Sequence, residues 1–194
     1  MQGKREVSIF KCWWQLKNHH STITRIILTT FLLLTTLSGQ TQTSKFESSK
    51  YAYTINIPSG FKQRAATGQH IDYKVVSNDG SSITVNVSQR LPEEIGIDGH
   101  SYSREYFNTV LKQLNSRITI SKCEKIFIDG KKVFLVYYSD PNEGWNDFKV
   151  ITANLFVGDN AYLITATAGK QNYITHKDVF SKTIKSIKFG SVSV

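Results

Sequence analysis

The chain has 194 residues and a formal net charge of +9, with 40% hydrophobic and 12% aromatic residues. A chain of this length is typically one domain, and its apolar content excludes an intrinsically disordered protein.

Residues 1–40 have the pattern of a secretory signal peptide. A basic stretch precedes the uncharged run Ile26–Leu37, which is followed by the small residues Ser38 and Gly39. As a helix this run reaches only ~18 Å, short of the ~30 Å core of a bilayer. A basic stretch, a short apolar run and small residues in this order favour a cleaved signal peptide and a secreted or periplasmic protein. The alternative is a single membrane anchor or a buried helix.

Removing residues 1–40 would leave 19 basic and 14 acidic residues, a net charge of +5. This mild excess predicts no nucleic-acid partner, which would require clustered lysines and arginines. Cys123 would be the one remaining cysteine, so no internal disulfide can form and the core must supply the stability.

After the leader, residues 41–49 are expected to be a short linker and residues 50–190 a single domain. The first strand, Tyr51–Ile57, is expected to bury one face. Pro58 should end its pairing, and Gly60 should let Phe61 turn into the core.

Three hairpins follow along the chain. Asp-Gly and related turns tolerate the positive φ angles that tight hairpins need. Such turns separate apolar runs at residues 78–80, 129–130 and 158–160. Three hairpins predict an antiparallel sheet.

Two of these strands differ in their faces. Ile83, Val85 and Val87 alternate with Thr84 and Asn86, which predicts a strand buried on one face only. By contrast, the run at residues 131–139 is apolar on both faces. We therefore expect it to be covered on both sides and to lie at the centre of the sheet.

Two helices are predicted to cover the sheet. Residues 100–118 carry an apolar stripe at helical spacing, and Asp98 and Ser101 are candidate caps. Residues 172–189 carry a second stripe. The stripes are Phe107, Val110, Leu111, Leu114 and Ile118, and Tyr173, Phe180, Ile184 and Ile187. The segregation of strands and helices indicates an α+β fold: an antiparallel sheet of six to seven strands covered by two or more helices.

Both ends of the predicted domain resemble the PsbP-like family. The resemblance rests on the motif "IPSGF" after the first strand and "SIKF" after the last helix, and it spans about residues 46–190. It implies the α/β/α fold of this family, which includes the extrinsic protein of the photosynthetic oxygen-evolving complex, the Ran-binding import factor and bacterial DcrB-like envelope proteins. Because members are mostly non-enzymatic and bind other proteins, it implies an accessory role.

The sequence carries no catalytic or cofactor motif. His70, His100 and His176 lie far apart and lack metal-binding spacings, and neither G-x-S-x-G nor a phosphate-binding glycine loop occurs. We expect no enzyme, no cofactor and no metal site, although the order of residues alone does not exclude a Ser-His-Asp triad.

The most distinctive loop is SDPNEGWNDF, residues 139–148. Its acidic and amide groups could provide oxygen ligands for calcium, but their spacing does not fit a calcium-binding loop, whereas Pro141 and Gly144 suit a long hairpin connection. A large aromatic residue on a polar loop can anchor a partner or fold back onto the sheet. We take the loop as a candidate partner-binding surface formed by Trp145, Asp140, Glu143 and Asp147.

The last helix has a basic edge of Lys177, Lys182, Lys185 and Lys188. This edge is either solvated or a weak contact for an anionic membrane surface or an acidic partner.

The leading hypothesis is a secreted, non-enzymatic interaction or accessory module of the cell envelope. The alternative is a binder of a small apolar ligand between sheet and helix, and an enzyme comes third. An apolar cavity of ~300 Å³ or more would favour the ligand.

Overall fold

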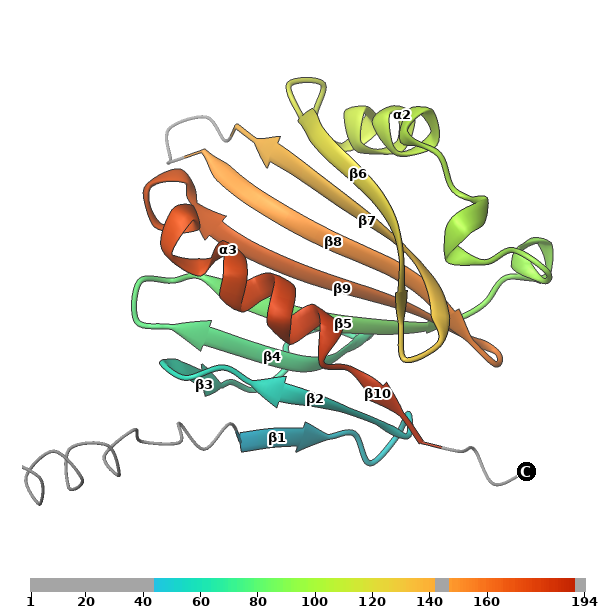
Figure 1. Ribbon diagram of the computed structural model, residues 1–194, viewed down its shortest axis with the longest axis horizontal. Helices are drawn as coiled ribbons and strands as arrows, with labels where there is room; N and C mark the ends of the chain where they lie inside the picture. Colours follow the sequence, from blue (N-terminus) through green and yellow to red (C-terminus); the bar gives the residue numbers. More distant parts are fainter. Residues whose placement is uncertain (1–43, 142–146, 191–194) are drawn as a thin grey trace, which may run out of the picture. The chain divides into compact units, whose positions relative to one another are not determined.

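The computed structural model of the protein describes residues 44–141 and 147–190. Within them, ten strands and two α-helices form an α+β domain (Figure 1). The elements before the first helix are β1 (Ser44–Glu47), β2 (Tyr53–Ile57), β3 (Phe61–Gln63), β4 (Ile71–Ser77), β5 (Ser82–Gln89) and the 3₁₀ turns η1 (Pro92–Glu94) and η2 (Gly99–Ser101). Then follow α2 (Arg104–Leu114), β6 (Thr119–Ile128), β7 (Lys131–Asp140), β8 (Phe148–Val157), β9 (Asn160–Gly169), α3 (Lys170–Lys185) and β10 (Lys188–Phe189).

The main sheet has seven antiparallel strands in the order β3-β4-β5-β9-β8-β7-β6. The three predicted hairpins are confirmed as β4–β5, β6–β7 and β8–β9. At the β6–β7 turn, Asp129 and Gly130 have φ angles of 50° and 71°, which is the positive-φ pair that a tight hairpin requires.

A second sheet joins the two ends of the domain in the order β1-β2-β10. Phe189 of β10 pairs with Tyr53 of β2, so the strand before "IPSGF" lies against the end of "SIKF". Tyr53 and Ile55 are buried, and after Pro58 the left-handed Gly60 (φ 81°) turns Phe61 into the core, as expected. Strand β1 lies within the expected linker at residues 41–49, and it pairs with β2.

One face of the main sheet is covered by α3, whose Phe180 and Ile184 are 0% and 1% exposed. They pack with Val85, Leu135 and the inward side chains of the neighbouring strands in the larger of the two core clusters. This cluster also includes Tyr53 of the small sheet. A single continuous core therefore holds α3, the small sheet and the main sheet together.

The other face is covered by α2 at one edge only. Phe107 and Leu111 of α2 pack with Phe134 and Val136 of β7, and the rings of Phe107 and Phe134 stack at 5.3 Å. In Figure 1, α2 lies beside β6 and β7, away from β4 and β5. The remainder of this face has no helix over it in the described part of the chain.

Three sequence-based expectations about α2 and β7 need correction. Strand β7 lies next to the edge strand β6 and not at the centre, because burial on both faces reflects two covering layers, α3 on one side and α2 on the other. Helix α2 is capped by Ser103, whose side chain accepts from the Tyr106 amide; Asp98 and Ser101 cap η2 instead. Leu114 is exposed because the helix ends there.

Candidate functional site

The uncovered part of the α2-side face combines polar side chains with the exposed Leu163. Asn154 of β8, Leu163 of β9 and Asn86 of β5 lie side by side in register. In the next row, Thr165 and Thr84 do the same, whereas Thr152, the neighbour of Thr165 on β8, is buried. Because strands alternate their side chains, the apolar neighbours of these residues point into the α3-side core. We call this surface, over β5, β9 and the end of β8, the open face.

A fourteen-residue segment, Arg90–Ser103, connects β5 to α2 beside the open face; we call it the connecting segment. Its first anchor is Arg90. The guanidinium donates to the carbonyl oxygens of Glu94, of Ile97 at 2.8 Å and of Gly158 at 3.4 Å. It also lies 4.4 Å from the centroid of the Phe156 ring. One side chain thus ties the segment to itself and to the β8–β9 turn.

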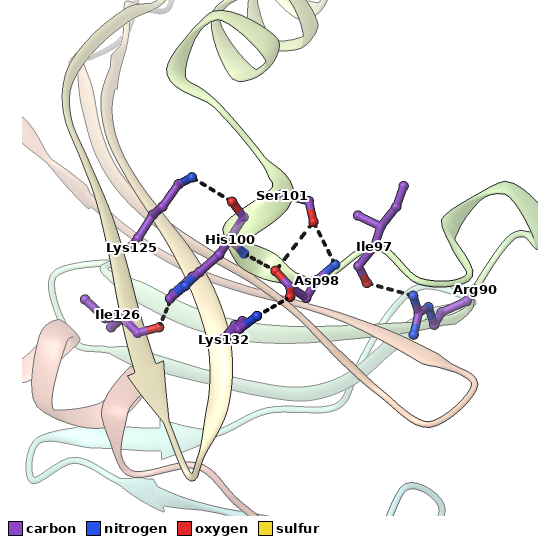
Figure 2. Close-up of polar contacts among 8 residues, drawn as sticks. All are labelled: Arg90, Ile97, Asp98, His100, Ser101, Lys125, Ile126 and Lys132. Carbon is purple, nitrogen blue, oxygen red and sulfur yellow. Dashed lines mark hydrogen bonds and ion pairs between the residues drawn. The ribbon is translucent and has the colours of Figure 1, made fainter.

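The second anchor surrounds Asp98 and is drawn in Figure 2. The Asp98 carboxylate accepts from the His100 amide at 2.8 Å and from Lys132 Nζ at 2.9 Å. The Lys132 hydrogen bond lowers the pKa of Asp98 below its usual range. His100 in turn contacts the Ile126 carbonyl through Nε2 at 2.8 Å, and Lys125 Nζ donates to the His100 carbonyl at 2.6 Å.

Gly99 brings the connecting segment directly onto strand β7. A Cβ atom at this position would lie 2.3 Å from the Lys132 carbonyl oxygen and 2.7 Å from Val133 Cα. Any other side chain would push the segment away from the sheet. The contact therefore depends on glycine.

A pocket of about 370 Å³ lies between the connecting segment and the open face. Glu94 and Tyr102 line it from the segment, and Asn86, Asn154 and Leu163 line it from the strands. Burial raises the pKa of Tyr102 to about 12, so its hydroxyl stays protonated. The Asn154 amide nitrogen is buried without a hydrogen-bond partner in the described part of the chain, an arrangement that costs roughly 1–3 kcal/mol.

Two exposed aliphatic side chains belong to the connecting segment. Leu91 is 55% and Ile95 77% exposed, on either side of η1. The backbone between them is fixed, since the Glu94 side chain accepts from the Leu91 amide at 2.8 Å and the Ile95 amide donates to Pro92. Because the backbone that carries them is already ordered, a partner can bury these apolar side chains with little further loss of conformational entropy.

The predicted partner-binding loop joins the end of β7 to the start of β8. Asp140 and Asp147 flank it, whereas Glu143 and Trp145 lie outside the described residues. Asp140 accepts from Asn115 Nδ2 at 2.8 Å. Lys170 Nζ lies 3.7 Å from an Asp147 carboxylate oxygen, and the Lys170 amide donates to the Asp147 carbonyl. Both carboxylates therefore contact groups within the fold, and the structure does not bring them to the pocket.

The histidines among the described residues occupy three separate places. His70 lines the pocket, His100 anchors the connecting segment, and His176 lies 2.7 Å from Asp79 at the β4–β5 turn. Cys123 packs against the α2 cluster, and burial raises the pKa of its thiol, which makes it a poor nucleophile. Among the described residues, no group of three or more His, Cys, Asp or Glu side chains could hold a metal ion.

Sequence reasoning missed the connecting segment as a site. It singled out Asp98, but as a cap of the helix. The available signal was LPEEIGIDGH, residues 91–100, a long aperiodic stretch in which three aliphatic residues alternate with Pro92, Gly96 and Gly99. A long connection of this kind is frequently functional.

The sequence model of the PsbP family matches residues 41–189. This match covers most of the chain, and the protein therefore belongs to the PsbP family. A comparison with curated proteins finds no match.

Solved structures of the same fold come from distant organisms. Cyanobacterial PsbP (CyanoP) from Synechocystis sp. PCC 6803 is 13% identical, with a TM-score of 0.57 over 79% of this chain and 96% of that chain. LpqN, involved in cell envelope biogenesis of Mycobacterium tuberculosis, is 12% identical, with a TM-score of 0.55 over 77% and 86%. The Ran-binding protein Mog1p of Saccharomyces cerevisiae is 9% identical, with a TM-score of 0.53 over 76% and 95%. At these identities the likeness establishes the fold alone.

Proposed function

We propose that the protein is an extracytoplasmic, non-enzymatic PsbP-family domain that acts by binding another protein of the cell envelope. The observation that carries the proposal is the connecting segment. It holds Leu91 and Ile95 exposed on either side of Glu94, which lines a pocket whose walls are partly polar. A partner covering this surface would bury apolar area at little entropic cost and would meet hydrogen-bonding groups such as Asn86 and Tyr102.

The relatives support the same class of role. One is a Ran-binding protein, and another takes part in cell envelope biogenesis. Export is supported by the basic, apolar and small-residue order of residues 1–40. None of the described helices is long and apolar enough to cross a bilayer. N-terminal sequencing of the protein recovered from the host tests export: a chain starting near residue 40 supports it, and an intact leader on a cytoplasmic protein contradicts it.

The alternative, an apolar ligand between sheet and helix, gains no support from the α3 interface. Large side chains fill that interface, among them Phe180, Ile184 and Ile187 with exposures of 0–1%. The 370 Å³ pocket lies on the opposite face and is lined in part by amide and carboxylate groups. The partly polar lining, and the exposed Leu91 and Ile95 on either side of the lining residue Glu94, favour a protein partner over a buried apolar molecule.

Site-specific photo-crosslinking in the living host tests the contact surface. A photoreactive residue at position 95 is compared with one at position 62, because Lys62 is also exposed but lies on the edge strand β3, outside both proposed contact surfaces. We expect one defined crosslinked species from position 95 and none above background from position 62. Equal crosslinking from both positions, or none from position 95, would contradict the proposal.

The SDPNEGWNDF loop remains a second proposed contact, with Trp145 as its anchor. Truncating an anchoring tryptophan commonly costs ~2 kcal/mol or more of binding without affecting the fold. Trp145→Ala should therefore weaken partner capture at least about tenfold, with little change in melting temperature. A sharp drop in melting temperature with unchanged capture per folded molecule would identify Trp145 as a core residue instead.

A further inference from the structure

The outer side of α3 combines exposed lysines with one exposed aliphatic residue. Its inner side is the buried one, with Phe180, Thr183 and Ile184. On the outer side, Lys177, Lys182 and Lys185 are exposed, and Ile174 is 76% exposed. Sixteen helical residues extend over ~24 Å, and at about 100° per residue these side chains spread over roughly 140° of the outward-facing surface of the helix.

Two other lysines near this surface form ion pairs, whereas these three do not. Lys188 Nζ lies 3.0 Å from Asp129, so the structure removes this residue from the predicted basic edge. Lys170 lies 3.7 Å from Asp147. For Lys177, Lys182 and Lys185, by contrast, no ion pair is formed within the described ranges 44–141 and 147–190.

Two acidic groups lie near this side of the helix and reduce its charge only in part. Asp178 is the one acidic residue of α3, and it is exposed. Glu124 of β6 pairs with Lys122 at 2.6 Å, and this hydrogen bond lowers the pKa of the Glu124 carboxyl, to which the charge of Lys185 also contributes. The outer side therefore keeps an excess of positive charge.

We propose that the outer side of α3 binds the surface of membranes that contain anionic phospholipids. The three unpaired lysines contact the headgroup phosphates, and Ile174 enters the interfacial layer. A lysine near an anionic bilayer surface strengthens binding roughly fivefold, so three of them supply ~100-fold. A soluble acidic partner would complement the lysines but would give no reason for the exposure of Ile174. A bilayer interface accommodates both the positive charge and the exposed aliphatic side chain.

This proposal is independent of the partner-binding surface. Helix α3 covers one face of the main sheet, and the pocket lies on the other. The protein could therefore rest on a membrane through α3 while it presents the connecting segment away from that membrane.

Vesicle co-sedimentation of the full chain tests the proposal. The vesicles consist of phosphatidylcholine alone or of phosphatidylcholine with phosphatidylglycerol; the neutral vesicles measure any binding that does not depend on anionic lipid. The variant Lys177→Gln/Lys182→Gln/Lys185→Gln is compared with Lys45→Gln/Lys62→Gln/Lys112→Gln, which removes the same charge from three exposed lysines elsewhere.

We expect binding to the anionic vesicles that weakens with salt, falls ~100-fold in the α3 variant and changes only a few-fold in the control variant. Ile174→Ser should weaken binding several-fold, whereas Leu114→Ser, at matched exposure, should not. Equal losses in either matched pair would overturn the assignment of this surface. So would equal binding to both kinds of vesicle, or binding to polyglutamate as tight as to the anionic vesicles.

Discussion

The two faces of the main sheet differ in what covers them. On the α3 side, the core residues of β5, β8 and β9 are 0–3% exposed under a helix and a second sheet. On the α2 side, the helix covers only the β6–β7 edge, and the half-buried Thr84 and Thr165 lie beyond it. We infer from this difference that the α3-side face contributes most of the folding stability. Residues on the α2-side face can be substituted, or covered by a partner, without unfolding the domain.

The largest expected effect lies on the α3 side. Phe180→Ala should lower the free energy of unfolding by about 3–5 kcal/mol, because the ring is fully buried and its removal leaves a cavity beside Phe61 and His176. Chemical denaturation measures this. A loss below about 0.5 kcal/mol would mean that α3 does not hold the core.

Leu111→Ala probes the smaller cluster under α2 and should cost about 2 kcal/mol, since Leu111 is 8% exposed at the edge of the domain. The same denaturation assay applies. A cost equal to or above that of Phe180→Ala would break the comparison between the two faces.

Asp79 and His176 connect the β4–β5 turn to α3 and predict a pH dependence. Partial burial opposes ionisation of Asp79, but hydrogen bonds from Ser77, from the Ser81 amide and from His176 outweigh it, so the pKa of Asp79 lies well below its usual range. A lowered carboxyl pKa contributes stability above the unfolded value near 3.8, and this contribution is lost as the pH falls below it.

Asp79→Asn should therefore cost about 1 kcal/mol at neutral pH, after allowance for solvent screening of a partly exposed pair. The cost should shrink as the pH falls below about 4. Denaturation curves at several pH values test this, and a cost that is independent of pH between about 2 and 7 would contradict it.

The smallest effect is expected on the open face. Thr165→Ala should change the free energy of unfolding by less than about 0.5 kcal/mol, because the side chain is half-buried and no helix covers it. A loss above 1 kcal/mol in the same assay would show that this face also supports the core.

The sequence predicts the parts of the fold that local patterns determine. The alternation of Ile83, Val85 and Val87 identifies the buried face of β5, and Asp129-Gly130 identifies a turn from the φ angles it requires. The position of β7 was wrong because a two-sided apolar pattern reports coverage and not strand order.

The candidate site was out of reach for the same reason. The pocket forms because Arg90 and Asp98 bind groups on β7, β8 and the β8–β9 turn, far away in the sequence. Neither residue belongs to a periodic pattern or a known motif. What the sequence shows is a long irregular connection, and its anchors are visible only in three dimensions.

The most direct test of the account is a paired measurement on Ile95→Ser. We propose that the connecting segment binds a partner and is not needed for the fold. We expect the free energy of unfolding to stay within about 0.5 kcal/mol of the wild type. Capture of the crosslinked partner should fall at least about tenfold. A loss of stability above about 1 kcal/mol, with unchanged capture per folded molecule, would contradict the claim.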